Sequence, residues 1–367
     1  MKDDIRKVLS YALNGELECL REEVDKLVSG GTLHISEIVH HKTGDGLIHV
    51  AARGGHVACI QYLLDNGVNV DQRNFEFKTP LHEASQSGQV GAVSSLLSAG
   101  AQVDSLKRAD WTPLMLAATK TDNLSCVRTL MEAGADLTVV NKDGWTCLHV
   151  AARTGDMETV RILTEKSPSC LNRISNNGRS VLHTACLAGH LEVVKFLVQQ
   201  PGGGGLVNCQ DSCGNSPLMD AARAGHLNCV QYLVTIPDLE MGAEDKMGRT
   251  VVQVAAEAGA LDILKFLYQR LDISVIDNVT ILTAAREGQA EVIQYLLECG
   301  ASHSCVDSHG RTPLFLSVSG QHTEAARVLL EAGADVNVED SQGNKLSSLA
   351  RKLAMVNLMG LHSTNGN

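Results

Sequence analysis

Aromatic residues are scarce in this chain, because Phe, Tyr and Trp together make up only 3% of its 367 residues. A conventional core of this size uses more of them, which disfavours two ordinary domains of about 150 residues each. Positive charge is also in deficit, since 31 Lys and Arg face 42 Asp and Glu for a net charge of -11. This balance argues against a general binder of DNA or RNA, although it leaves room for a local basic patch, and we expect no direct nucleic-acid partner.

Long apolar runs are missing as well. No stretch approaches the roughly 18 consecutive apolar residues that a membrane span needs. Residues 1–7 include acidic side chains and lack the apolar core of a signal peptide. We therefore expect a protein that is neither secreted nor membrane-spanning, with no membrane among its partners.

The cysteines do not form the patterns of a disulfide framework or a zinc site. Their number, eleven, is odd, and no CxxC pair occurs. Cys19, Cys59, Cys126 and Cys229 recur at one position of the repeat described below, which predicts buried, reduced thiols that fill space. Reduced thiols imply a reducing compartment, and we expect a cytoplasmic and nuclear location.

Catalytic motifs are absent too: the chain has no HExxH, no GxxxxGK[ST] and no GxSxG. Histidine is plentiful, but His49, His82, His149 and His183 occupy one equivalent position, which indicates repeated structure. We expect these rings to hydrogen-bond turns and helix caps and to bind no metal. The sequence therefore predicts a protein that is not an enzyme and carries no cofactor.

A repeat organises the chain. A pair of small residues recurs at intervals of 29 to 36 residues, and its first members are Ala51, Ala84, Ala117, Ala151, Ala185, Ala221, Ala255, Ala284 and Ser317. Each unit reads as a polar turn, a short helix, a glycine turn and a second helix. Thr79 can cap the first helix, and Pro80 suits its first position. The pattern predicts an all-α solenoid of paired antiparallel helices with hairpin-like turns, comprising about nine repeats plus terminal caps.

The repeat also sets the expected domain organisation. Residues 1–40 form an N-terminal capping repeat with a long connection, and residues 41–340 hold the repeats. Residues 341–361 form a C-terminal capping helix region, and residues 362–367 form a frayed tail. The glycine run at 202–205 is expected to be a surface loop insertion, although a flexible joint is an alternative.

The repeated segments resemble a known family. Thr79-Pro80-Leu81-His82, with Ala84 and Gly88, and its counterparts at residues 112–115, 148–152 and 312–315 are similar to the signature of the ankyrin repeat. The resemblance covers nearly the whole chain. It implies a non-catalytic solenoid that binds other proteins through its turn tips and first helices, and we expect a monomer.

The turn tips hold the candidate partner-binding residues. Both tryptophans, Trp111 and Trp145, occupy the same position of consecutive turns, where other repeats carry polar residues. Exposed tryptophan is costly unless something covers it, and Trp and Arg dominate protein interfaces. The neighbouring residues predicted to share this partner-binding cluster are Phe75, Phe77, Lys78 and Arg108. The alternative is that each indole folds onto its own neighbouring turn.

Residues 106–115 and 141–145 resemble one vertebrate member of the ankyrin family more specifically. The resemblance implies that this chain binds the catalytic domain of alanyl-tRNA synthetase and accepts wrongly activated serine on its lysine side chains. Lys142 matches an acceptor position of that relative. A second acceptor position holds Arg108, whose guanidinium stays protonated, so adjacent Lys107 is the substitute. A third falls near Asn172, where Lys166 is the closest lysine. The rival interpretation is a generic ankyrin scaffold, for example a substrate adaptor of a ubiquitin ligase.

Overall fold

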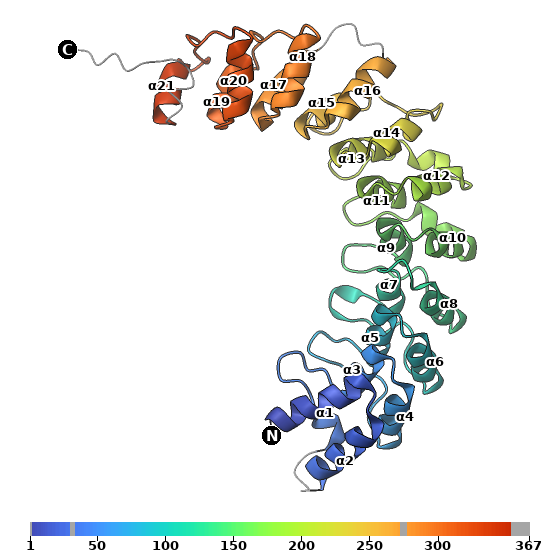
Figure 1. Ribbon diagram of the computed structural model, residues 1–367. Coiled ribbons are helices and arrows are strands. Elements are labelled where there is room, and N and C mark those ends of the chain that lie inside the picture. The colour runs from blue at the N-terminus through green and yellow to red at the C-terminus, as the bar shows by residue number, and fades with distance from the viewer. Residues whose placement is uncertain (1, 30–33, 272–276, 354–367) are drawn as a thin grey trace, which may run out of the picture. The chain divides into compact units, whose positions relative to one another are not determined.

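The computed structural model describes residues 2–29, 34–271 and 277–353. Within these ranges the helices follow one another in ten pairs, and a single helix, α21 (Leu346–Lys352), comes after the last pair (Figure 1). The first helices of the pairs are α1 (Lys2–Asn14), α3 (Leu47–Gly54), α5 (Pro80–Ser87), α7 (Pro113–Ala117), α9 (Cys147–Thr154), α11 (Val181–Ala188), α13 (Pro217–Arg223), α15 (Val251–Glu257), α17 (Asn278–Glu287) and α19 (Pro313–Ser319). The second helices are α2 (Leu17–Val28), α4 (Val57–Asp65), α6 (Val90–Ser98), α8 (Leu124–Glu132), α10 (Met157–Lys166), α12 (Leu191–Gln199), α14 (Leu227–Leu233), α16 (Leu261–Leu271), α18 (Ala290–Glu298) and α20 (Thr323–Glu331).

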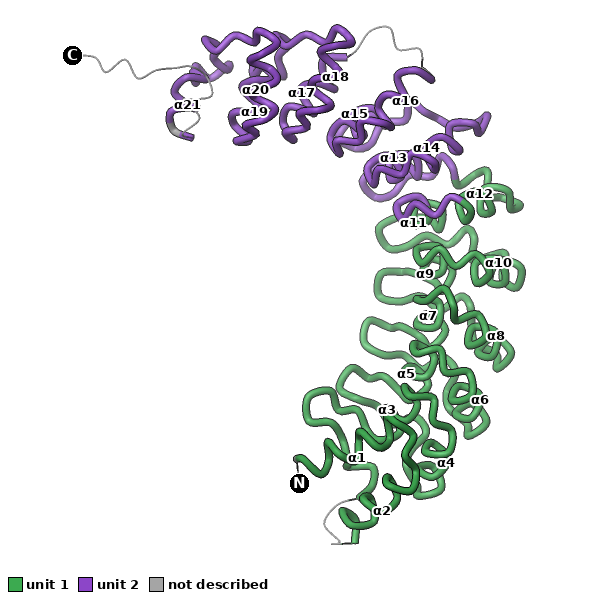
Figure 2. The backbone as a smooth tube through the Cα atoms, viewed as in Figure 1, with its two compact units in different colours: residues 1–185, 192–206 green, residues 186–191, 207–367 purple. Residues whose placement is uncertain are grey.

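The chain divides into two compact units, residues 1–185 with 192–206 and residues 186–191 with 207–367 (Figure 2). In the first unit each first helix packs on the next, from α1 through α3, α5 and α7 to α9, and the second helices pack in the same order from α2 to α10. In the second unit the first helices from α13 to α19 pack on one another in the same way, and the single helix α21 packs on α19. The described residues contain isolated β-bridges and no β-strand. The predicted all-α class is confirmed.

Histidine links consecutive repeats through backbone contacts. His82 Nδ1 accepts a hydrogen bond from the Thr79 N–H at 3.1 Å, and His82 Nε2 donates to the Trp111 carbonyl oxygen of the next repeat at 3.1 Å. His49 and His149 make the equivalent pair of contacts. An imidazole that accepts at one nitrogen and donates at the other is neutral. The prediction that these rings serve caps and turns is confirmed.

The predicted burial of the four equivalent cysteines is confirmed for all but the most N-terminal of them. All eleven thiols are free, and Cys59, Cys126 and Cys229 are buried. Cys19 is exposed, so its predicted burial is wrong. Cys19 lies on α2, the first of the second helices in the described residues.

The glycine run that follows α12 in the sequence forms a 3₁₀ turn, η4 (Gly203–Leu206). Gly203 is buried, and its N–H donates to the Gln200 carbonyl oxygen at 2.8 Å. A Cβ at Gly203 would lie 2.0 Å from the Leu197 carbonyl oxygen, whereas a Cβ at Gly204 would meet nothing within 4 Å. The insertion is thus a packed surface turn in which one glycine is sterically required.

The two ends of the described chain carry the expected helices. Residues 1–40 contain α1, α2 and the short 3₁₀ turn η1 (Ile35–Glu37), whose Ile35 is buried. The predicted C-terminal capping region contains α21, but its residues 354–361 and the predicted tail 362–367 lie outside the described residues. No helix in the described ranges is long and apolar enough to cross a membrane.

Candidate partner-binding surface

Each hairpin-like turn between repeats is closed by its own backbone. In the turn at residues 141–145, hereafter tip 141–145, the Asn141 N–H donates to the Trp145 carbonyl oxygen at 3.0 Å. The Asn141 side-chain oxygen accepts from the N–H groups of Asp143 and Trp145, each at 2.9 Å. Asn74 makes the same contacts in tip 74–78. An asparagine at this position therefore fixes the turn that presents the neighbouring side chains.

The tips are joined side by side. The N–H of the second residue of a tip donates to a carbonyl oxygen of the preceding tip. The bonds of this row are Phe75 N–H to Thr43 O (3.0 Å), Arg108 N–H to Glu76 O (2.9 Å), Lys142 N–H to Ala109 O (3.0 Å) and Asn176 N–H to Asp143 O (2.9 Å). Tips 74–78, 107–111 and 141–145 thus form a continuous surface within the first unit.

The two tryptophans are half-buried, and each indole has one face against a cation of its own chain. The guanidinium carbon of Arg153 lies 5.6 Å from the centroid of the Trp145 ring. The His149 ring stacks on the Trp145 ring, with the two centroids 6.1 Å apart. The Lys107 ammonium lies 5.7 Å from the centroid of Trp111. The indoles are therefore neither part of the core nor freely projecting. They keep exposed surface for a partner while their own neighbours hold them in place.

The two phenylalanines of tip 74–78 are more exposed than the tryptophans. Phe75 is 57% exposed and Phe77 is 50% exposed. The Phe75 ring lies against Gly44, where a Cβ would be 2.5 Å from its Cδ1 atom. Tip 74–78 therefore presents substantial apolar surface to solvent.

Lys78, predicted to face a partner, is engaged within the chain. Its side chain is 16% exposed, and Nζ lies 3.2 Å from Glu83 Oε1 and 2.9 Å from Gln86 Oε1. Glu83 Oε2 also accepts a hydrogen bond from Arg53 Nε at 2.8 Å. Arg53 Nη2 forms a second ion pair with Asp45 Oδ2 at 2.7 Å. Burial alone would raise the pKa of Glu83, but the hydrogen bond and charge of Arg53 outweigh burial and hold this pKa below its usual value. The cluster joins side chains of two consecutive repeats, so the participation of Lys78 is not evident from the sequence of a single repeat.

The candidate acceptor lysines lie in two places. Lys107 and Lys142 lie on adjacent tips, and Lys142 is exposed, as is Arg108. Burial, with a smaller contribution from the charge of Lys78, lowers the pKa of Lys107. Lys166 lies instead at the end of α10, in a groove of about 310 Å³ whose other lining residues are Arg128, Met131, Glu132, Ala135, Leu137 and Ile162. The structure brings Lys107 and Lys142 together on the tips and places Lys166 on the second helices.

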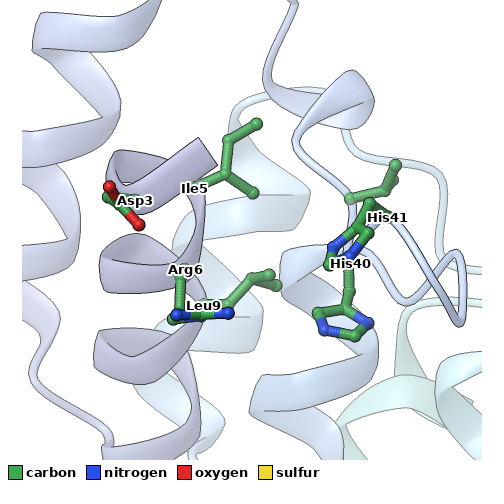
Figure 3. Close-up of a pocket in the computed structure, with 7 residues that line it drawn as sticks. Asp3, Ile5, Arg6, Leu9, His40 and His41 are labelled. Carbon is green, nitrogen blue, oxygen red and sulfur yellow. The ribbon is translucent and has the colours of Figure 1, made fainter. Parts of the chain in front are cut away.

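A smaller pocket of about 190 Å³ lies at the N-terminal cap (Figure 3). Arg6 and Leu9 of α1 line one side of it, and His40 and His41 line another. The two imidazole rings lie 5.0 Å apart, and His40 Nδ1 is 3.1 Å from Thr43 Oγ1. Among the residues placed in the structure, no three His, Cys, Asp or Glu side chains are grouped to hold a metal ion.

The fold and the tips together define a class, a helical-repeat protein that serves as a binding scaffold for other proteins. A family model described as "Ankyrin repeats (3 copies)" matches residues 9–107, 48–141, 114–204, 202–278 and 275–340. The chain belongs to the ankyrin repeat family. Members of this family are generally non-catalytic scaffolds.

The chain is also similar to curated proteins over part of its length. The chain is 33% identical over 70 residues to ankyrin repeat-containing protein P1E11.10 of Schizosaccharomyces pombe, a match covering 19% of this chain and 34% of that protein. It is 29% identical over 108 residues to neurogenic locus notch homolog protein 2 of Homo sapiens, covering 28% of this chain and 4% of that protein. The crystal structure of the ankyrin repeat domain of Bcl-3 matches with 30% identity, a TM-score of 0.49, 61% of this chain and 100% of that chain. The chain thus spans about a third of the length of the first of these curated relatives and 4% of the second.

Proposed function

We propose that this chain is a co-regulator of alanyl-tRNA synthetase, similar in role to ankyrin repeat domain-containing protein 16. It binds the catalytic domain of the synthetase and accepts misactivated serine on lysine side chains, which limits serine-for-alanine mistranslation. One observation supports the proposal above the others: Trp111, Trp145, Lys107 and Lys142 lie on two adjacent tips joined by a backbone hydrogen bond. Aromatic anchors and amine nucleophiles are therefore presented on the same surface.

The acceptor step is a simple acyl transfer. A neutral lysine amine attacks the carbonyl carbon of the seryl adenylate, an amide bond forms, and the bond from that carbon to the phosphate oxygen breaks. AMP leaves with the electron pair, and the nitrogen releases its proton to water. The lysine is consumed, so the protein acts as a sink and not as a catalyst.

Lys107 is the better-prepared nucleophile of the two tip lysines. At a reference pKa near 10.4, on the order of one lysine in a thousand is neutral at pH 7. Burial and the charge of Lys78 lower the pKa of Lys107, which increases its neutral fraction. Docking on the synthetase would supply the remaining advantage as a high effective concentration.

The proposed setting is the cytoplasm and the nucleus. The eleven free cysteines are consistent with such reducing compartments. A single chain is the proposed acting form, since the tip surface lies within one unit.

Replacing both indoles tests the docking surface. We expect the Trp111→Ala, Trp145→Ala double variant to bind the synthetase catalytic domain several hundredfold or more weakly, because buried tryptophan anchors are each worth about 2 kcal/mol or more. Binding would be measured by titration calorimetry, with circular dichroism to verify folding. Met247→Ala is the matched control, because Met247 is 75% exposed on a tip of the other unit. Unchanged affinity of the double variant would remove the indoles from the interface.

Mass spectrometry tests the acceptor role. After incubation with synthetase, ATP and serine, we expect seryl adducts on Lys107 and Lys142, with Lys166 as the third proposed acceptor. Lys107→Arg should lose its own adduct while the affinity stays the same, because the guanidinium keeps the charge but not the nucleophile. Lys246→Arg is the control, on a tip of the other unit. Adducts on none of the three lysines would end the acceptor proposal and leave docking to the binding assay.

A further inference from the structure

The next-to-last residue of each described tip has a backbone conformation that normally requires glycine. In seven tips this residue is glycine with φ between +72° and +82°, namely Gly44, Gly144, Gly178, Gly214, Gly248, Gly310 and Gly343. Two of the described tips depart from this rule, with Phe77 at φ +59° and Asp110 at φ +59°. Asp is among the residues that tolerate the left-handed region, but a bulky aromatic residue there is an outlier.

The surrounding backbone holds Phe77 in this conformation. The Phe77 N–H donates to the Asn74 carbonyl oxygen at 2.9 Å, and the Asn74 side-chain oxygen accepts from the next N–H, that of Lys78, at 2.9 Å. The Asn74 side chain is itself held by a hydrogen bond that its Nδ2 donates to Asp45 Oδ1 at 2.6 Å. Glycine would satisfy the same backbone bonds without steric cost. The phenyl side chain is therefore not needed to form the tip.

The phenyl ring of Phe77 keeps much of its surface exposed. It is 50% exposed, and the described residues place no other ring and no cation against it. By contrast, Trp111 and Trp145 each have a cation on one face, and Phe75 lies against Gly44. Phe75 is the more exposed of the two phenylalanines, but Phe77 combines an exposed ring with a positive φ. Residues in unfavourable backbone conformations cluster where a ligand is held.

We infer that Phe77 is the aromatic anchor of the partner-binding surface, inserting its ring into an apolar pocket on the catalytic domain of alanyl-tRNA synthetase. The inference rests on the proposed function, because it takes the partner from there. A phenyl ring has no hydrogen-bonding group, so the matching pocket is apolar, and the adjacent indole of Trp111 continues the contact. The backbone cost of tip 74–78 is present in the unbound chain, and burial of the ring on binding would provide the contact energy.

The test separates stability from binding. Phe77→Gly is expected to leave the free energy of unfolding in urea unchanged or higher, since glycine suits φ +59°. The same variant is expected to bind the synthetase catalytic domain at least tenfold more weakly. Phe75→Gly is the stability control, because Phe75 is similarly exposed without a positive φ, and glycine there should lower stability.

Three results of these measurements would overturn the anchor role of Phe77, and one of them would also overturn the proposed function. If Phe77→Gly keeps the wild-type affinity while the double tryptophan variant loses it, the anchor role is overturned and the proposed function stands. A marked loss of stability in Phe77→Gly overturns the anchor role as well, because the ring would then be structural. If the wild-type chain does not bind the synthetase, the proposed function and this inference fall together.

Discussion

The free energy of unfolding is expected to decrease steeply as the pH is lowered from about 6.5 to 4. Burial lowers the pKa of His82 and of His149 to about 4. An unfolded histidine has a pKa near 6.5, so between these two values the unfolded chain binds more protons than the native chain. The contribution of each neutral, buried imidazole to the free energy of unfolding is complete above pH 6.5. It is lost as the pH falls toward 4, and the loss amounts to about 3 kcal/mol for each ring. Urea unfolding at a series of pH values measures this loss.

The chain itself supplies the control for this prediction. Gln253 occupies the equivalent position in α15, where its side-chain oxygen accepts from the Thr250 N–H at 2.7 Å and its amide nitrogen donates to Asp277 at 3.1 Å. Glutamine thus makes the same type of cap without a titrating group. His82→Gln with His149→Gln should keep most of the stability at pH 7 and flatten the decline between pH 6.5 and 4. An equally steep decline in this variant would show that other groups cause it.

Gly203→Ala is expected to destabilise the first unit by about 3 kcal/mol, the upper end for overpacking a rigid site. The added Cβ would lie 2.0 Å from the Leu197 carbonyl oxygen and 2.9 Å from that of Val198. Backbone atoms cannot move aside as a flexible side chain can, so either η4 or the end of α12 must shift. Equilibrium urea unfolding would report the loss as a lower midpoint.

Gly204→Ala is the matched control for this steric effect. A Cβ at Gly204 meets nothing within 4 Å, although the residue is adjacent in the same run. Its substitution should change the free energy of unfolding by less than about 1 kcal/mol. Equal effects at both positions would mean that the glycine run matters for chain flexibility and not for the close packing of Gly203.

The fold was predictable because each helix pair is specified by local signals. A capping Thr, a first-turn Pro and a His three residues after the cap recur in the sequence, and in the structure they begin α5 with the predicted contacts. Repetition of this unit also identifies the equivalent histidines as structural. Local signals do not predict burial at every equivalent position, since Cys19 is exposed.

The aromatic side chains of the tips were evident from the sequence, but the contacts that they and their neighbours make were not. The sequence identifies the tips with Trp111 and Trp145, because large aromatic residues replace polar ones there. It does not reveal that Lys78 pairs with Glu83 or that Lys107 is half-buried, because both depend on contacts made only after folding. The signal for Phe77 was present as a missing glycine, but its meaning depends on the measured φ.

The row of backbone bonds between tips has a thermodynamic consequence. Isolated surface loops usually lose conformational freedom on association, and that loss opposes affinity. Here the amide of Arg108 is already bonded to Glu76, and the amide of Lys142 to Ala109. Much of the ordering has therefore taken place in the unbound protein. For the proposed docking, more of the contact energy would then be available as net association free energy.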